Sequence, residues 1–300
     1  MIKTELPEKS KSHEAVIHEI RDVIVENYAD KVAFVILFGS FARGDWVHDY
    51  YTEEGYDLEY ASDYDFLVIT KKAKTGSGYQ ATKFRDDIEA KLKSFQFPNK
   101  PHKPAIIVES LARVNDDLEK GQYFFSDIKK EGILLYHDQE FELAEPRQLS
   151  SDEAREIAKN DFDRWFNKGD DFLQDSYSAL KAKRNNNAAF YLHQTTESFL
   201  TCALLVLTGY KPKSHDIKYF LSLASSQSNK FLNTFPLINK EQKNCFELLR
   251  KAYIDSRYSK DYKITKEQLG YLIKRVEYLQ NVTQEVCKEK VKLIHLQTNI

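Results

Sequence analysis

Two short motifs near the start of the chain combine residue types that can bind phosphate and a metal ion. The first, Gly39-Ser40-Phe41-Ala42-Arg43-Gly44, follows an apolar run, and the second, Asp63-Tyr64-Asp65, opens another. A Gly-Ser step after a buried strand lets backbone amides and a hydroxyl approach a phosphate closely. Two acids separated by one residue in a strand lie on the same face, where their oxygens can ligate a divalent cation. The motifs together predict a site for a nucleoside triphosphate and its metal ion.

The segments around these motifs have the residue patterns of β-strands and amphipathic helices. The run Val32–Phe38 predicts a buried strand that ends at the first motif, and residues 65–69 predict a strand that begins within the second. Further strands are expected at residues 105–108 and 133–136, with helices at residues 16–24, 82–93 and 113–120. Strands that alternate with amphipathic helices indicate an α/β pattern, which ends near Pro146.

A strand, a Gly-Ser turn, a short helix and an Asp-x-Asp that enters the next strand together resemble the polymerase β-type nucleotidyltransferase superfamily. The resemblance implies an α+β domain with a small mixed sheet and flanking helices. It also implies that Asp63 and Asp65 are catalytic and bind Mg²⁺ or Mn²⁺, and that the nucleotide contacts Gly39, Ser40, Arg43 and Ser62. Residues 45–61 separate the two motifs by more than the usual few residues, so we expect an inserted loop or hairpin there.

The superfamily normally has a third carboxylate on a neighbouring strand, for which Glu109 is the candidate. It ends the predicted strand at residues 105–108, and the alternation of a strand puts Ala105, Ile107 and Glu109 on one face. A catalytic glutamate and a plain solvent-facing glutamate both fit this position.

The second half of the chain, residues 147–300, has the periodicity of long helices and no strand signal. Ser150 and Glu153 are spaced as a capping box, and Thr265 and Gln268 repeat that spacing before the last helix. Helices are also expected at residues 188–207, at 217–224 and around residues 245–253. We therefore predict two domains, residues 1–146 and residues 147–300, of which the second is a helical bundle.

Three segments of this bundle resemble the HEPN superfamily: residues 193–198, residues 209–215 and residues 252–258. Ribonucleases of that superfamily carry R-x(4-6)-H, and here Arg257 is followed at the matching distance by Tyr262. Tyrosine, with an ordinary pKa of about 10, is a poor proton shuttle near neutrality. Arg257 could bind a nucleotide or phosphate, or pair with a nearby acid. The resemblance also implies a homodimer through the helical domain.

Composition restricts the partners of the chain. A net charge of −2 over 300 residues gives no overall cationic field for nucleic acid, although a local basic groove stays open. The first residues lack the apolar core of a signal peptide, and no apolar run approaches the length of a membrane span. The three cysteines are far apart in helical patterns, which favours buried reduced thiols. We expect a cytoplasmic protein without a membrane partner.

Three functions are consistent with these residues. The leading hypothesis is a magnesium-dependent nucleotidyltransferase that moves NMP from an NTP such as ATP to a hydroxyl of a protein or small molecule. The second is a nucleotide-binding regulatory or toxin-antitoxin-like module with little turnover. The third is a HEPN ribonuclease, against which Tyr262 counts.

Overall fold

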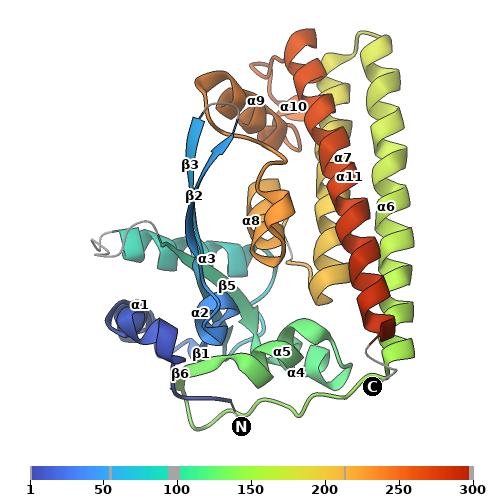
Figure 1. Ribbon diagram of the computed structural model, residues 1–300. Helices are drawn as coiled ribbons and strands as arrows, with labels where there is room; N and C mark the ends of the chain where they lie inside the picture. The colour runs from blue at the N-terminus through green and yellow to red at the C-terminus, as the bar shows by residue number, and fades with distance from the viewer. Residues whose placement is uncertain (1, 54–55, 94–101, 213, 297–300) are drawn as a thin grey trace. The chain divides into compact units, whose positions relative to one another are not determined.

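The computed structural model describes residues 2–53, 56–93, 102–212 and 214–296 of the chain. These residues divide into two compact units, Met1–Gln148 and Leu149–Ile300. The first unit is built on a small mixed sheet and the second is helical (Figure 1). The division falls two residues after the boundary that the change in sequence pattern predicts.

The described residues of the first unit form a four-stranded sheet in the order β5-β4-β1-β6. The strands are β1 (Val32–Phe38), β4 (Tyr64–Thr70), β5 (Pro104–Ser110) and β6 (Ile133–His137). The central strand β1 is antiparallel to β4 and β6, whereas β4 and β5 are parallel. Every residue of β1 and β4 is buried, which explains why both segments are almost continuously apolar.

Short helices flank this sheet. They are α1 (Glu14–Tyr28), α2 (Gly39–Arg43), α3 (Gly78–Lys93), α4 (Leu111–Glu119) and α5 (Tyr123–Glu131). Ile17, Ile20 and Ile24 of α1 are fully buried in one core with residues of β1, β4 and α3. Each such isoleucine contributes about 1.5–3 kcal/mol through burial of its apolar surface.

A two-stranded antiparallel hairpin occupies the insertion between the two motifs. It consists of β2 (His48–Glu53) and β3 (Tyr56–Ala61), and it pairs His48 with Ala61 at its base. The expectation of a loop or hairpin at residues 45–61 is thus met by a hairpin.

Two segments of the first unit differ from what their local sequence indicates. The first dozen residues have the charged composition of a disordered terminus, but Lys3 forms a β-bridge with Ile133, and residues Glu8–His13 form the 3₁₀ helix η1. Buried Leu6 and Ser10 explain this order, because they attach the segment to the core. Ser126 has the side chain of a helix N-cap, but α5 begins earlier, at Tyr123, and the Ser126 hydroxyl donates to the carbonyl of Gln122, the residue before the helix.

In the described part of the second unit, three long helices lie side by side (Figure 1): α6 (Ser151–Lys181), α7 (Asn185–Thr208) and α11 (Lys266–Leu296). Helix α7 packs against both of the others, and most of its residues are buried. Both predicted capping pairs form their reciprocal hydrogen bonds, Ser150 with Glu153 and Thr265 with Gln268. Shorter segments complete the bundle: α8 (Ile217–Gln227), η2 (Asn229–Phe231), α9 (Lys240–Lys251) and α10 (Asp255–Tyr258).

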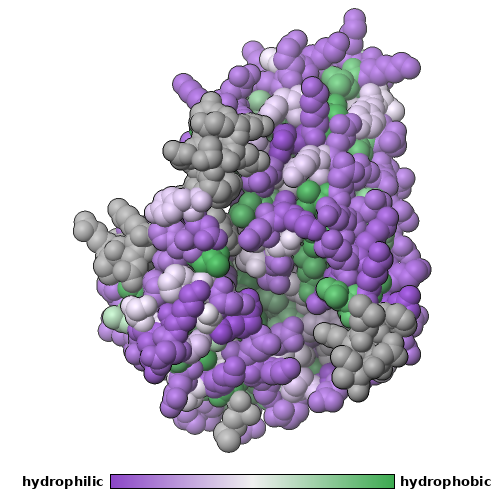
Figure 2. Space-filling view, viewed as in Figure 1, coloured by the Kyte–Doolittle hydropathy of each residue, from purple (hydrophilic) through white to green (hydrophobic). Residues whose placement is uncertain are grey.

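The surface in view is mainly hydrophilic, with small and scattered apolar areas (Figure 2). Within the described ranges, no helix is both long and apolar enough to cross a membrane. Cys202, Cys245 and Cys287 are buried free thiols, which confirms their expected state.

Candidate functional site

The two polar motifs meet at one end of the central strand pair. The antiparallel register of β1 and β4 places Phe38 opposite Asp65, so that Gly39, the next residue, lies against the Asp65 side chain. Gly39 has a positive φ of 71°, and a Cβ atom added there would lie 2.2 Å from Asp65 Oδ2. Only glycine fits this contact, because the clash and the left-handed backbone both penalise a side chain.

The carboxylates of Asp63 and Asp65 form a strained electrostatic pair. Burial raises the pKa of Asp63 to about 6, although the positive charge of Lys103 and a backbone hydrogen bond with Lys103 oppose this shift. Asp65 is 7% exposed, and burial followed by the charge of Asp63 raises its pKa well above the ordinary range. The Arg43 guanidinium acts in the opposite direction on Asp65. A bound cation would offset both the cost of burying the two negative charges and the repulsion between them.

The turn around α2 is fixed by backbone bonds. The Ser40 carbonyl accepts from the N–H groups of Gly44, at 2.8 Å, and of Asp45, at 3.1 Å, and Gly44 ends the helix with a φ of 83°. Arg43 is exposed, and its Nε lies 3.1 Å from Asp45 Oδ2. Two residues of this turn thus act on the Asp65 carboxylate, Gly39 by close contact and Arg43 through its charge.

Two predicted site residues, Ser62 and Glu109, make contacts away from the Asp65 carboxylate. Ser62 is buried, and its Oγ accepts from the Val47 N–H while its own N–H donates to the Val47 carbonyl, which closes the base of the hairpin. Glu109 pairs in register with Ile69 of β4, whereas Asp65 pairs with Ala105. Four residues of strand separate the two levels, or about 13 Å.

Glu109 is therefore a correction to the sequence-based site. Its buried carboxylate lies 3.1 Å from Nη1 of Arg113, one helical turn further along, and this ion pair compensates its charge. At the level of the carboxylate pair, β5 presents Ala105, and Lys103 precedes it. Among the residues described, no group of three or more His, Cys, Asp or Glu side chains is arranged to hold a metal ion.

A buried cluster of aromatic and histidine rings packs together residues of the two motifs. Tyr64, between the two aspartates, is fully buried, with its ring 4.4 Å from that of Phe41 of α2 and its hydroxyl 2.7 Å from Nδ1 of His13. His102 Nδ1 donates to the Ser62 carbonyl at 2.7 Å, and Trp46 stacks on Phe41. The sequence offered only the mixture of aromatic and histidine residues in this region as a signal, and no periodicity links these residues.

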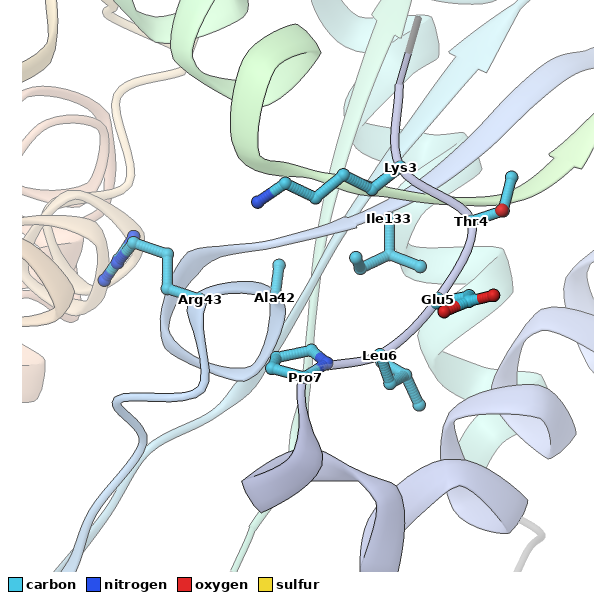
Figure 3. Close-up of a pocket in the computed structure, with 8 residues that line it drawn as sticks. All are labelled: Lys3, Thr4, Glu5, Leu6, Pro7, Ala42, Arg43 and Ile133. Carbon is cyan, nitrogen blue, oxygen red and sulfur yellow. The ribbon is translucent and has the colours of Figure 1, made fainter.

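A groove of about 460 Å³ opens beside α2 (Figure 3). The N-terminal segment, α2 and the start of β6 line it, and the lining residues are Lys3, Thr4, Glu5, Leu6, Pro7, Ala42, Arg43 and Ile133. Sequence reasoning missed the N-terminal segment as part of this region.

In the second unit, Arg257 and Tyr262 do not form an acid–base pair. The Tyr262 hydroxyl is largely buried and donates to the Leu248 carbonyl at 3.0 Å, and burial raises its pKa. Arg257 donates to the Tyr253 carbonyl and lies over the rings of Phe190, Tyr253 and Tyr258. It forms no ion pair within the described ranges, so the expected partnership with a nearby acid is wrong.

His193 and His215, in the segments that resemble the HEPN superfamily, are both hydrogen-bonded. His193 Nδ1 donates to the Leu249 carbonyl at 3.0 Å. His215 Nδ1 lies 3.0 Å from Oε1 of the buried Glu197, and the rings of both histidines stack on Tyr253. This network connects α7, the loop before α8 and the end of α9.

Comparison with known proteins decides what the second unit is. Residues 162–286 match the HEPN domain family. A HEPN domain is thus present in the helical unit, from within α6 to within α11. The match covers less than half of the chain and does not extend to the first unit, and no curated protein matches the chain.

The acidic pair fits a divalent cation of the magnesium type in part. Mg²⁺ commonly takes one or two protein carboxylates and completes its shell with substrate phosphates and water. Asp63 and Asp65 supply such a pair, and burial raises the pKa of both carboxyls despite the opposing charges of Lys103 and Arg43.

Proposed function

We propose that the first unit is a nucleotidyltransferase, which transfers NMP from an NTP to a hydroxyl acceptor on a protein or small molecule. The observation that carries this proposal is the contact of Gly39 with the Asp65 carboxylate. It joins a phosphate-sized turn and an acidic pair in one place.

The reaction exchanges one phosphorus–oxygen bond for another. The acceptor oxygen bonds to the α-phosphorus, the bond to the β-phosphate oxygen breaks, pyrophosphate leaves, and the hydroxyl proton is released. Mg²⁺ or Mn²⁺ held by Asp63 and Asp65 supplies charge neutralisation for the phosphates. The chain holds this pair in register by the β1–β4 ladder, and Gly39 and Ser40 provide the close backbone approach.

The test is incubation of the full chain with Mg²⁺ and each labelled NTP, followed by pyrophosphate detection and intact-mass analysis of the chain and of candidate acceptors. Asp63→Ala and Asp65→Ala are expected to lower turnover at least about 100-fold, since a bound metal contributes several kcal/mol to such reactions. Asp116→Asn, at an exposed pair with Lys120, is the matched control and should retain activity. Equal turnover by all variants would place the site elsewhere.

A second candidate function is nucleotide binding with little turnover, in a regulatory or toxin-antitoxin-like module. It is favoured by the absence of a third acid beside the pair within the described residues, where β5 offers Ala105 and Lys103 precedes the strand, and by the presence of a HEPN domain. Calorimetric binding of NTP without pyrophosphate release would select it. A HEPN ribonuclease is disfavoured because Tyr262 is buried and engaged.

The proposal includes a homodimer formed through the HEPN domain and a cytoplasmic location. The free buried thiols of Cys202, Cys245 and Cys287 agree with a reducing compartment.

A further inference from the structure

A cavity of about 570 Å³ opens at the end of the helical unit where α6 ends and α7 and α11 begin (Figure 1). The residues that line it are Tyr177, Leu180, Lys181, Lys183, Asn185 and Lys266. None of these lining residues is acidic, and neither Arg257 nor Tyr262 is among them. The volume is in the range of sites that bind small ligands, and three lysines give this one a positive charge.

The three lysines of the cavity have no carboxylate partner within the described ranges, whereas Lys159 of α6 pairs with Asp163 at 3.0 Å. Glu267, which follows the last of the three lysines in the sequence, does not line the cavity. Glu277 of α11 accepts a hydrogen bond from the Tyr177 hydroxyl at 2.5 Å, so its carboxylate is already engaged. Three like charges around one cavity repel one another, and a bound anion would offset that repulsion.

Lys183 occupies a backbone position at which glycine is usual. Its φ is 60°, and it is the one non-glycine residue with a positive φ in the described part of the chain. Its N–H donates to the Leu180 carbonyl, and the N–H of Arg184 donates to the Ala179 carbonyl, both at 2.9 Å. This pattern, the Schellman motif at the end of α6, favours glycine because a side chain is strained there. The chain thus has a cation beside the cavity at a position where the backbone alone favours glycine.

Hydrogen bonds between separate segments hold the walls of the cavity. Asn185 Nδ2, at the start of α7, donates to the Ile264 carbonyl at 3.1 Å. The reciprocal bonds of Thr265 and Gln268 fix the start of α11, where Lys266 lies. The lysines therefore extend from a fixed backbone, which lowers the entropic cost of gathering their charges around a ligand.

We propose that this cavity binds a small ligand with two or more adjacent phosphate groups through Lys181, Lys183 and Lys266. A lysine ammonium binds phosphate as a compact point charge with three donors. Three such groups around one cavity match an anion that carries several charges close together. The cavity lies in the second unit, so the inference goes beyond the function proposed for the first unit and does not depend on it.

The experiment is a calorimetric titration of the full chain with inorganic tripolyphosphate at low salt, in a chelator that removes metal-dependent binding by the first unit. Lys181→Gln and Lys266→Gln each remove one charge and are expected to weaken binding about fivefold to tenfold. Lys183→Gly should weaken binding to a similar extent and raise the midpoint of thermal unfolding, because glycine suits a φ of 60°. Lys292→Gln is the control, since Lys292 is an exposed lysine of α11 that does not line the cavity. This variant should bind tripolyphosphate as the wild type does.

Weaker binding by a more stable Lys183→Gly variant cannot result from misfolding and would support the inference. Orthophosphate should bind far more weakly than tripolyphosphate, and equal affinities would overturn the claim of adjacent phosphate groups. Binding of ADP or pyrophosphate that depends on the three lysines supports the inference, and the tighter of the two identifies the source of the diphosphate group. The inference is overturned if tripolyphosphate does not bind, if Lys292→Gln weakens binding equally, or if only single-stranded RNA shows binding that depends on these lysines.

Discussion

At the scale of single residues, Asp63 and Asp65 place two acids where the fold disfavours their charge. An acid whose pKa is raised on folding holds its proton more tightly in the folded state than in the unfolded state. The folded protein therefore loses stability as the pH rises from the unfolded pKa, about 4, through the folded pKa of Asp63, about 6. The site is a local cost to stability that a bound cation can offset.

We predict that Asp63→Asn stabilises the metal-free protein at pH 8 by about 1–3 kcal/mol. The upper end of this range is the free-energy equivalent of a pKa raised by about two units on folding. The gain should shrink to about 0.5 kcal/mol or less at pH 4, where the acid is protonated in the folded state and about half protonated in the unfolded state. Urea unfolding at both pH values in a chelator measures it. Asp116→Asn serves as the control for loss of an exposed carboxylate. A stability difference that is the same at both pH values would contradict the electrostatic explanation.

Gly39 gives the second prediction at this scale. Gly39→Ala should destabilise the first unit by about 1–3 kcal/mol, because its φ of 71° is unfavourable for alanine and the new Cβ would meet Asp65 Oδ2. Gly270→Ala, in α11 with open space around it, should act in the opposite direction by about 0.5–1 kcal/mol. Thermal unfolding compares the two. If the contact with Asp65 is the cause, Gly39→Ala costs less in an Asp65→Ala background.

At the scale of elements, the site depends on how α2 and β4 are joined. Tyr64 faces away from the carboxylates into the ring cluster, and its hydroxyl binds His13 Nδ1 in a buried position. We expect Tyr64→Phe to cost about 1–2 kcal/mol, since it removes a buried hydrogen bond to an imidazole nitrogen. Tyr28→Phe, at a partly buried ring in α1, should cost less than about 0.5 kcal/mol. Chemical unfolding of both variants tests this, and equal costs would argue against the hydrogen bond.

Strand and helix positions followed well from periodicity, but relations between strands did not. Val32–Phe38 is an uninterrupted apolar run, so β1 was predicted with its exact ends. Glu109 was assigned to the site because alternation fixes which face a side chain takes, whereas its level along β4 depends on the pairing register. Local patterns also could not show that residues 3–7 join α2, since that contact is made by the fold of the whole unit.

At the scale of the whole molecule, the HEPN domain leaves large apolar side chains exposed. Ile254 is 57% and Tyr258 76% exposed, both at α10. We expect a two-fold dimer through the helical unit that covers such residues. Light scattering at micromolar concentration should give twice the mass of one chain, and Ile254→Glu should lower it. A monomeric wild-type mass would refute this prediction.

The proposed nucleotidyltransferase site lies in the first compact unit, so the second, helical unit can be tested for an activity of its own. The helical unit expressed alone from Leu149, and the full chain, should not cleave RNA in the presence of a chelator. Metal-independent cleavage needs one group that removes the ribose 2′-hydroxyl proton and another that protonates the leaving oxygen. Tyr262 occupies the position of the family's histidine, and its hydroxyl is bound to the Leu248 carbonyl with a raised pKa.

The assay uses structured and single-stranded RNA with the wild type, Arg257→Ala and Tyr262→His. Inactivity of the wild type is expected on both substrates. Cleavage that appears only in Tyr262→His would show that the missing imidazole is the reason. Robust cleavage by the wild type that disappears in Arg257→Ala would refute the prediction. His215 would then be the candidate proton-transfer group. Its Nδ1 is hydrogen-bonded to Glu197, and its ring and the Arg257 guanidinium both contact the ring of Tyr253.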